Sequence, residues 1–145
     1  MKIDYTKPNV WGVIASLWQL PQITIAAIVI LFSLIFTPRK AFYAYTNKYL
    51  TVWELRLNMS HDAPFCFSLG PFIITPFRVT DDTVKHESGH CMQSLFLGPL
   101  YLLAVGLPSV VLVLYKRAKN KSADWYHSKY PEKWADNLAG VSRDN

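Results

Sequence analysis

Two histidines and a glutamate stand close together in the stretch TVKHESGHCMQS, residues 83–94, where they are spaced as His86-Glu87-x-x-His90. In a helix, residues four positions apart lie on one face, so both imidazoles can bind a single metal ion. Glu87 lies beside them, where its carboxylate can take a proton from a water molecule on that ion. The spacing predicts a hydrolytic zinc site, and the alternative is two histidines on the surface of a helix.

A third metal ligand has to come from elsewhere in the chain. The longer pattern HExxHxxGxxH is not met, because Gln93 and Phe96 occupy its glycine and third-histidine positions. Downstream, the stretch PEKWADNLAGV places Glu132 and Asp136 four positions apart, on one helical face. Glu132 can complete a three-ligand site that leaves a position for water, while Asp136 can accept the free N–H of a ligand histidine. The alternative is a solvated helix on which the two carboxylates are paired by chance.

The pairing of HESGH, residues 86–90, with EKWAD, residues 132–136, resembles the gluzincin metallopeptidases. It looks most like their membrane-embedded branch, which includes the CAAX-prenyl proteases and HtpX and has ExxxD as its second motif. The two segments are also similar to segments of small bacterial membrane proteins. The resemblance covers about the last eighty residues and is specific only in the two motifs. The chain is far shorter than those proteases and lacks their chamber of several membrane spans.

The resemblance implies a zinc ion bound by His86, His90 and Glu132. It also implies that Glu87 is the general base and that Asp136 hydrogen-bonds to a ligand histidine from behind. The expected activity is hydrolysis of a peptide bond by a zinc-activated water, with Glu87 passing the proton to the leaving amine.

The charge that develops on the carbonyl oxygen in such a reaction needs a further hydrogen-bond donor. By residue type and neighbourhood, the candidates are His127, Tyr126 and Arg143. His61 can bind a metal or donate, but a loop histidine beside an aspartate needs no such role. Two other functions stay open. One is a non-catalytic membrane accessory or immunity protein with a structural metal or none, and the other is an amidase or deformylase-like zinc hydrolase.

The composition indicates one domain with an apolar surface. The chain has 145 residues, of which 51% are hydrophobic and only 17% charged, below the usual quarter of soluble domains. The net charge is +5, but the basic residues mostly flank apolar runs, and no nucleic-acid-binding motif accompanies them. Cys66 and Cys91 form no CxxC pair, so both are interpreted as small buried side chains.

The N-terminal part contains the apolar run ITIAAIVILFSLIF, residues 23–36. Extended back to Trp11, this run is long enough to span a bilayer, with Pro21 kinking the helix or dividing it. A cleaved signal peptide is the alternative, but no small-x-small site precedes Pro38. Residues 1–40 are therefore predicted to be a transmembrane anchor, which places the protein in a membrane, in this interpretation the bacterial cytoplasmic membrane.

Residues 41–80 are rich in Phe, Ile, Val and Thr and are broken by turn residues, which predicts short strands or a hairpin. Pro71 and Pro76 argue that at least one strand lies at a sheet edge. In gluzincins an edge strand near the active helix aligns the substrate backbone, and SLGPFIIT, residues 68–75, is the segment that the resemblance suggests for this role. The alternative is that this segment is ordinary sheet core.

The second apolar run, residues 94–115, would be ~33 Å long as a straight helix. Residues 116–131 would then have to bring Glu132 back through hydrocarbon with unpaired backbone groups, so a simple span conflicts with the metal site. We expect a helical hairpin instead, folding back at Gly106-Leu107-Pro108. It would be re-entrant, membrane-associated or packed on the first run, and the alternative is a buried core hairpin.

Together these patterns predict an α+β membrane protein. Its anchor, residues 1–40, would precede a zincin-like metallohydrolase domain, residues 41–145, with an HExxH helix, an ExxxD helix and a small β-hairpin or sheet. The expected partners are a peptide or membrane-protein substrate and membrane lipid. A closed chamber around the site would require several copies of the chain, so a homo-oligomer is one expected arrangement.

Overall fold

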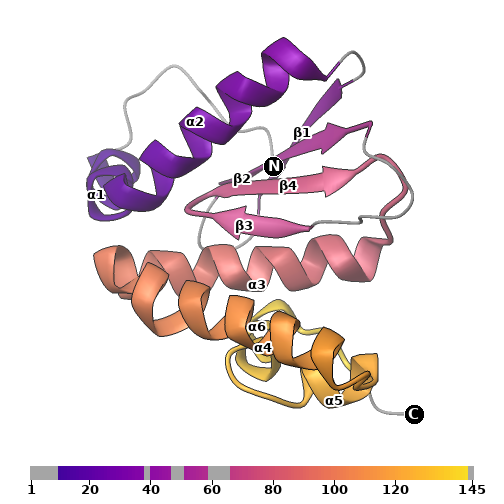
Figure 1. The fold of residues 1–145 in the computed structure, drawn as a ribbon. Helices are drawn as coiled ribbons and strands as arrows, with labels where there is room; N and C mark the ends of the chain where they lie inside the picture. Colours follow the sequence, from indigo (N-terminus) through magenta and orange to yellow (C-terminus); the bar gives the residue numbers. More distant parts are fainter. Residues whose placement is uncertain (1–9, 38–39, 47–50, 59–65, 144–145) are drawn as a thin grey trace.

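The computed structural model describes residues 10–37, 40–46, 51–58 and 66–143 (Figure 1). Within them the chain forms helices α1 (Val10–Trp18), α2 (Leu20–Phe36), α3 (Asp81–Leu97), α4 (Leu107–Ala118), α5 (Ala123–His127) and α6 (Glu132–Ala139). The strands are β1 (Lys40–Thr46), β2 (Thr51–Leu57), β3 (Phe67–Leu69) and β4 (Phe72–Pro76). A 3-10 turn (Gly98–Leu100) and a π-helical turn (Leu102–Gly106) join α3 to α4. The fold is α+β with a small sheet, but the predicted fold class, an α+β membrane protein with an N-terminal transmembrane helix, is wrong.

The four strands form one mixed sheet in the order β1-β2-β4-β3. β1 is antiparallel to β2, β2 is parallel to β4, and β4 is antiparallel to β3. The segment 68–75 thus contains most of a tight hairpin, in which β3 is an edge strand and β4 an inner one. Gly70 lies in the turn with φ +60°, a backbone conformation that residues with a Cβ atom rarely adopt.

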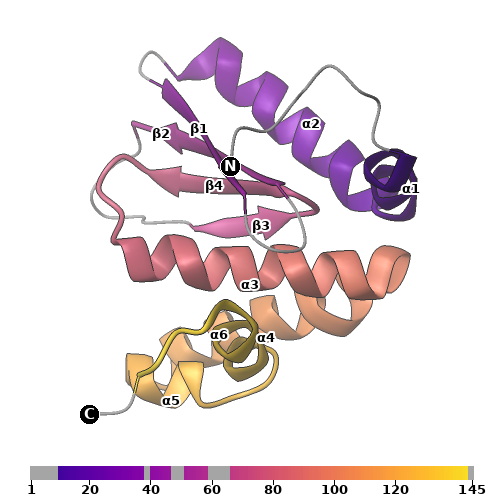
Figure 2. The same ribbon diagram turned by 180° about the vertical axis from the view of Figure 1, so that it is seen from behind.

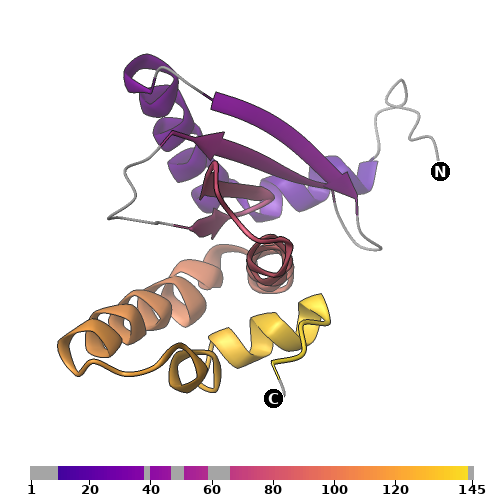
Figure 3. The same cartoon turned by 90° about the vertical axis from the view of Figure 1, so that its right-hand side faces the viewer.

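Two helices cover the sheet, one on each face (Figures 1 and 2). On one face Leu55 and Ile74 pack with Val29 and Ile30 of α2. On the other face Val52 and Ile73 pack with Cys91 of α3. Alternate residues of one strand point to opposite faces, which is why β2 and β4 serve both layers. Figure 3, which looks along α3, shows α4 and α6 on the side of α3 away from the sheet.

Helix α6 packs very closely against α3, and Gly89 makes this possible. A Cβ atom at Gly89 would lie 2.1 Å from the backbone oxygen of Ala135 in α6. Any side chain there would therefore have to push the two helices apart. This contact brings the HExxH segment of α3 against the ExxxD segment of α6.

The chain reverses direction at the end of α3, at Gly98, and not at Gly106-Leu107-Pro108 as expected. Gly98 has φ +51°, and a Cβ there would lie 2.2 Å from Cε2 of Trp18. Gly106 instead has helical angles, φ −58° and ψ −52°, and continues directly into α4. Pro108 is tolerated because it falls in the first turn of α4, where no backbone N–H partner is lost.

The prediction of a transmembrane helix, and with it of a location in a membrane, is wrong. No helix in the described residues combines the length and the apolar character needed to cross a bilayer. The run from Trp11 to Phe36 is broken at Gln19 into α1, with nine residues, and α2, with seventeen. At 1.5 Å per residue α2 is about 25 Å long, shorter than the ~30 Å hydrocarbon core. α2 also packs Val29 and Ile30 against the sheet, so part of its apolar surface belongs to the protein core.

The close approach of α3 and α6 can be tested with Gly89→Ala. We expect this variant to lose about 3 kcal/mol of unfolding free energy, the upper end of the usual cost of overfilling a packed interface, because the new methyl meets backbone. The measurement is urea unfolding followed by circular dichroism. Gly106→Ala is the matched control, since its nearest neighbours would lie at 3.9 Å. Equal stability of the two variants would contradict the close packing.

Candidate metal centre

The site begins with the N-terminal turn of α3, which fixes where the helix starts. The Thr80 side chain accepts a hydrogen bond from the backbone N–H of Thr83 at 3.3 Å. Asp81 and Asp82 lie in the first turn, where negative charge stabilises the helix dipole. The helix therefore begins one turn before His86 and presents His86 and His90 on a common face.

The structure brings the two histidines together with Glu132 of α6. Glu132 Oε2 lies 3.0 Å from His86 Nε2 and 3.1 Å from His90 Nε2. Glu132 is fully buried, and the two histidines are only 5% and 6% exposed. These three residues form a buried group that can hold a metal ion.

Each histidine is oriented by a second hydrogen bond at its other ring nitrogen. His86 Nδ1 lies 2.7 Å from Asp136 Oδ1, and His90 Nδ1 lies 2.7 Å from Gln93 Oε1. The Gln93 amide is itself fixed, because its Nε2 donates to the Pro131 carbonyl at 3.0 Å. Both Nδ1 atoms thus donate a proton to an acceptor, and both Nε2 atoms face Glu132, where each can donate a hydrogen bond when the ring is protonated or bind a metal ion when it is neutral.

The Glu132 carboxylate is also oriented by a second hydrogen bond. Its Oε1 accepts a hydrogen bond from Ser109 Oγ of α4 at 2.5 Å, so Oε2 is the oxygen directed at the histidines. Gln93 and Ser109 were not predicted as site residues from the sequence. Gln93 lies about one helical turn after His90, so helical spacing alone could have predicted that the two side chains meet. Ser109 lies 23 positions before Glu132, and its sequence neighbourhood carried no such signal.

The electrostatics of this group favour positive charge between its members. Burial alone would raise the pKa of the Glu132 carboxyl, but hydrogen bonds with His86 and His90 hold it well below its usual range. Burial also lowers the pKa of His90, yet the hydrogen bond and charge of Glu132, with the charge of Glu87, raise it above its ordinary value. Three lone-pair-bearing atoms within about 3 Å repel one another unless a proton or a metal ion lies between them. Two imidazoles and a carboxylate, each held from behind, fit a divalent metal ion.

Glu87 lies next to this group but points to the sheet side of α3. Ser68 Oγ of β3 donates to Glu87 Oε2 and also lies 2.9 Å from the Glu87 backbone oxygen. The edge strand β3 therefore positions the carboxylate that the sequence assigned as general base. Ser68 was noticed in the sequence only as the start of the segment 68–75.

A cleft of about 670 Å³ leads to the metal group. Its lining includes Glu87, His90 and Glu132, and most of its other lining residues are apolar, several of them from β3 and α4. Two of the three candidate metal ligands therefore face open space that a substrate can enter.

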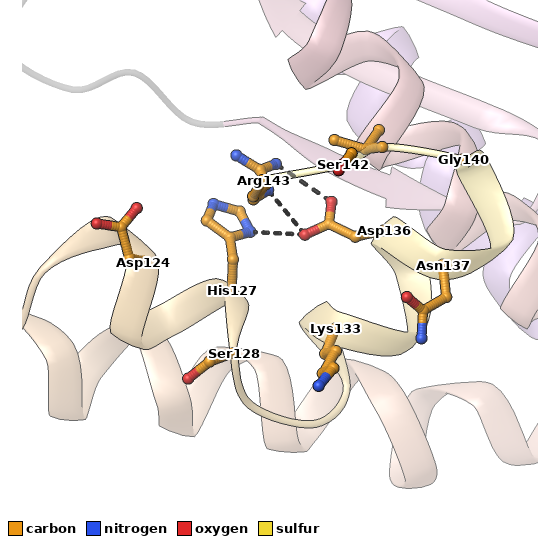
Figure 4. Close-up of a pocket in the computed structure, with 10 residues that line it drawn as sticks. Asp124, His127, Ser128, Lys133, Asp136, Asn137, Gly140, Ser142 and Arg143 are labelled. Carbon is orange, nitrogen blue, oxygen red and sulfur yellow. Dashed lines mark hydrogen bonds and ion pairs between the residues drawn. The ribbon is translucent and has the colours of Figure 1, made fainter. Parts of the chain in front are cut away.

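The structure separates the three residues proposed as oxyanion donors. Tyr126 lines the cleft, with its hydroxyl 3.4 Å from Ser109 Oγ, and burial raises the pKa of this phenol well above its usual range. His127 and Arg143 lie on the other side, around Asp136, in a separate pocket of about 520 Å³ (Figure 4). His61 lies outside the described residues.

His127 and Arg143 both face the Asp136 carboxylate. Arg143 Nε donates to Asp136 Oδ2 at 2.7 Å, while His127 Nδ1 lies 3.6 Å from the same oxygen (Figure 4). Burial, followed by the charges of His86 and Arg143, lowers the pKa of His127 to about 4. This arrangement supports Asp136 behind His86 and places neither residue in the cleft.

Comparison of the chain with models of protein families, with curated proteins and with solved structures gave no match in any of the three. The resemblance to gluzincins therefore stays a prediction that rests on the two sequence motifs.

The hydrogen bond from His90 to Gln93 can be tested with Gln93→Leu. We expect metal affinity to fall about 10- to 100-fold, the usual cost of losing a partner behind a metal ligand. Affinity is measured by competition with a chromophoric chelator. Ser88→Ala is the matched control on the same helix, because the Ser88 hydroxyl donates to the Lys85 backbone oxygen and not to a histidine of the site. Unchanged affinity in Gln93→Leu would show that His90 needs no such support.

Proposed function

We propose that this protein is a zinc-dependent hydrolase that cleaves peptide bonds. The observation that carries the proposal is the convergence of His86 Nε2, His90 Nε2 and Glu132 Oε2 at the end of a cleft, with Glu87 beside them. Two imidazoles and one carboxylate are a common ligand set of hydrolytic zinc. When bound, zinc would polarise the substrate carbonyl and lower the pKa of a water molecule.

Glu87 is the residue placed to move the proton. Ser68 occupies its Oε2, so Oε1 is the oxygen that accepts the proton from the attacking water. As the new C–O bond forms and the C–N bond breaks, the same oxygen returns the proton to the leaving nitrogen. The HESGH motif supports this role, because it sets Glu87 next to His86 in the chain while the carboxylate turns to the cleft.

Tyr126 is the residue placed to stabilise the carbonyl oxygen. Its hydroxyl is near Ser109, which contacts Glu132, and its raised pKa keeps it protonated as a hydrogen-bond donor at neutral pH. His127 and Arg143 stand behind Asp136 instead and are assigned positioning roles.

Two features favour a catalytic metal over a structural one. Structural zinc sites are closed by four protein ligands, whereas the group found in the described residues has three. The cleft also reaches this group, so a fourth position is accessible to water or substrate. The lining of the cleft runs along α4 from Leu107 to Arg117, which favours a peptide over the small substrates of amidases and deformylases.

Glu87→Gln separates catalysis from metal binding. We expect this variant to keep one zinc ion per chain, while hydrolysis falls about 10²- to 10⁴-fold because the general base is lost. His86→Ala and Glu132→Ala should lose both the metal and the activity. The measurements are metal content by mass spectrometry and cleavage of an unstructured protein substrate.

Asp82→Asn is the matched control, because Asp82 is an exposed carboxylate on the same helix that forms an ion pair with Lys85. It should retain zinc and full activity. A wild-type protein that binds no zinc, or a Glu87→Gln variant of undiminished activity, is incompatible with the proposed mechanism.

Tyr126→Phe tests the oxyanion donor. We expect kcat to fall about 10²-fold with little change in KM, because the hydrogen bond strengthens in the transition state. Tyr130→Phe is the control, since the Tyr130 hydroxyl bonds to the Ala104 backbone oxygen. A drop in kcat of the same size in both variants would remove Tyr126 from the mechanism.

A further inference from the structure

One face of α4 forms a wall of the cleft. Leu107, Val110, Val113 and Leu114 line it, at spacings of three, three and one, which places them on one side of a helix. Leu107, Val110 and Leu114 are each more than half exposed. The opposite wall contains Ile25 from α2 together with Phe67 and Leu69 from β3.

The edge strand offers little backbone for pairing with a substrate. β3 has three residues, and the carbonyl of its central residue, Ser68, accepts a hydrogen bond from the Tyr101 hydroxyl at 3.2 Å. The Ser68 side chain is already bonded to Glu87. Recognition in this cleft therefore depends more on side chains than on strand addition.

The charges along the cleft are arranged asymmetrically. Glu87 and Glu132 lie at the metal end, and Arg117 is the one lysine or arginine among the lining residues of the described chain. Arg117 stands eight positions after Ser109 on α4, about 12 Å along the helix axis. An extended peptide covers this distance in three to four residues.

We propose that α4 selects the substrate: a polypeptide with a large aliphatic or aromatic side chain beside the cleaved bond and an acidic residue three or four positions away. This inference rests on the proposed function, since it deepens the specificity of the same site. The apolar side chain is favoured because it covers the exposed leucine and valine side chains of α4. The acidic residue is favoured at Arg117 and repelled at the Glu87 end.

The test measures binding without hydrolysis, using zinc-loaded, full-length Glu87→Gln protein. The probes are fluorescein-labelled peptides of alanine and serine, with one central leucine and one glutamate placed three or four positions to either side. Affinity is read by fluorescence anisotropy. We expect replacement of the leucine by serine to weaken binding about tenfold or more. Replacement of the glutamate by lysine should weaken it about fivefold, and this second effect should vanish in Arg117→Ala.

Matched variants locate the interaction on one face of α4. Val110 and Val111 are 57% and 55% exposed, but only Val110 lines the cleft. In the Glu87→Gln background, Val110→Asp should weaken binding of the leucine peptide about tenfold, and Val111→Asp should not. Lys119→Ala is the control for Arg117→Ala. Thermal melts followed by circular dichroism check that each variant is folded. We expect all of them to fold, because the substituted side chains are exposed.

The outcomes separate this inference from the proposed function. Equal effects of Val110→Asp and Val111→Asp, or no preference for leucine, would overturn the inference even when wild-type protein cleaves peptides. Selective binding to Glu87→Gln protein supports the assignment of α4, and failure of the wild type to cleave the same peptides would then count against the peptidase function alone.

Discussion

The structure depends on one buried interaction, the approach of the Glu132 carboxylate to the Nε2 atoms of His86 and His90. A buried carboxylate is costly unless hydrogen bonds and a positive charge compensate it. Ser109 supplies a hydrogen bond at one oxygen, and the His86 imidazole lies 3.0 Å from the other, where positive charge on a histidine or on a bound metal ion would compensate the carboxylate. Gly89 makes the approach possible, because α6 lies where a side chain would be.

Helix α3 links this interaction to the rest of the molecule. One side of it carries His86 and His90 against α6, and the other side packs Cys91 against the sheet. Glu87 reaches β3 and is held there by Ser68. A single helix thus places His86 and His90 on the side of α6 and directs Glu87 toward β3. The sheet and α6 act as two supports that fix the orientation of α3.

The N-terminal part shows why hydropathy wrongly predicted a transmembrane helix. The sequence prediction joined the apolar residues from Trp11 to Phe36 into one membrane anchor, kinked or divided at Pro21. In the structure the helix breaks at Gln19 and α2 begins at Leu20, with Pro21 in its first turn. The apolar residues are then divided between contacts with the sheet and an exposed face that includes Ile28, Leu31 and Phe32. Hydropathy counts apolar residues but does not say which of them another element will cover.

The sequence by itself determined the local pairs. The four-residue spacings of His86 with His90 and of Glu132 with Asp136 require only helical periodicity. Only the tertiary structure decided which nitrogen meets which oxygen and that Gln93, Ser109 and Ser68 support the site. The tertiary structure also places the adjacent Tyr126 and His127 in different pockets. The reason is physical: Gln93, one turn from His90, is oriented by Pro131, and Ser109 and Ser68 reach across 23 and 19 positions. Contacts over such separations are set by how helices and strands pack, which helical or strand periodicity does not encode.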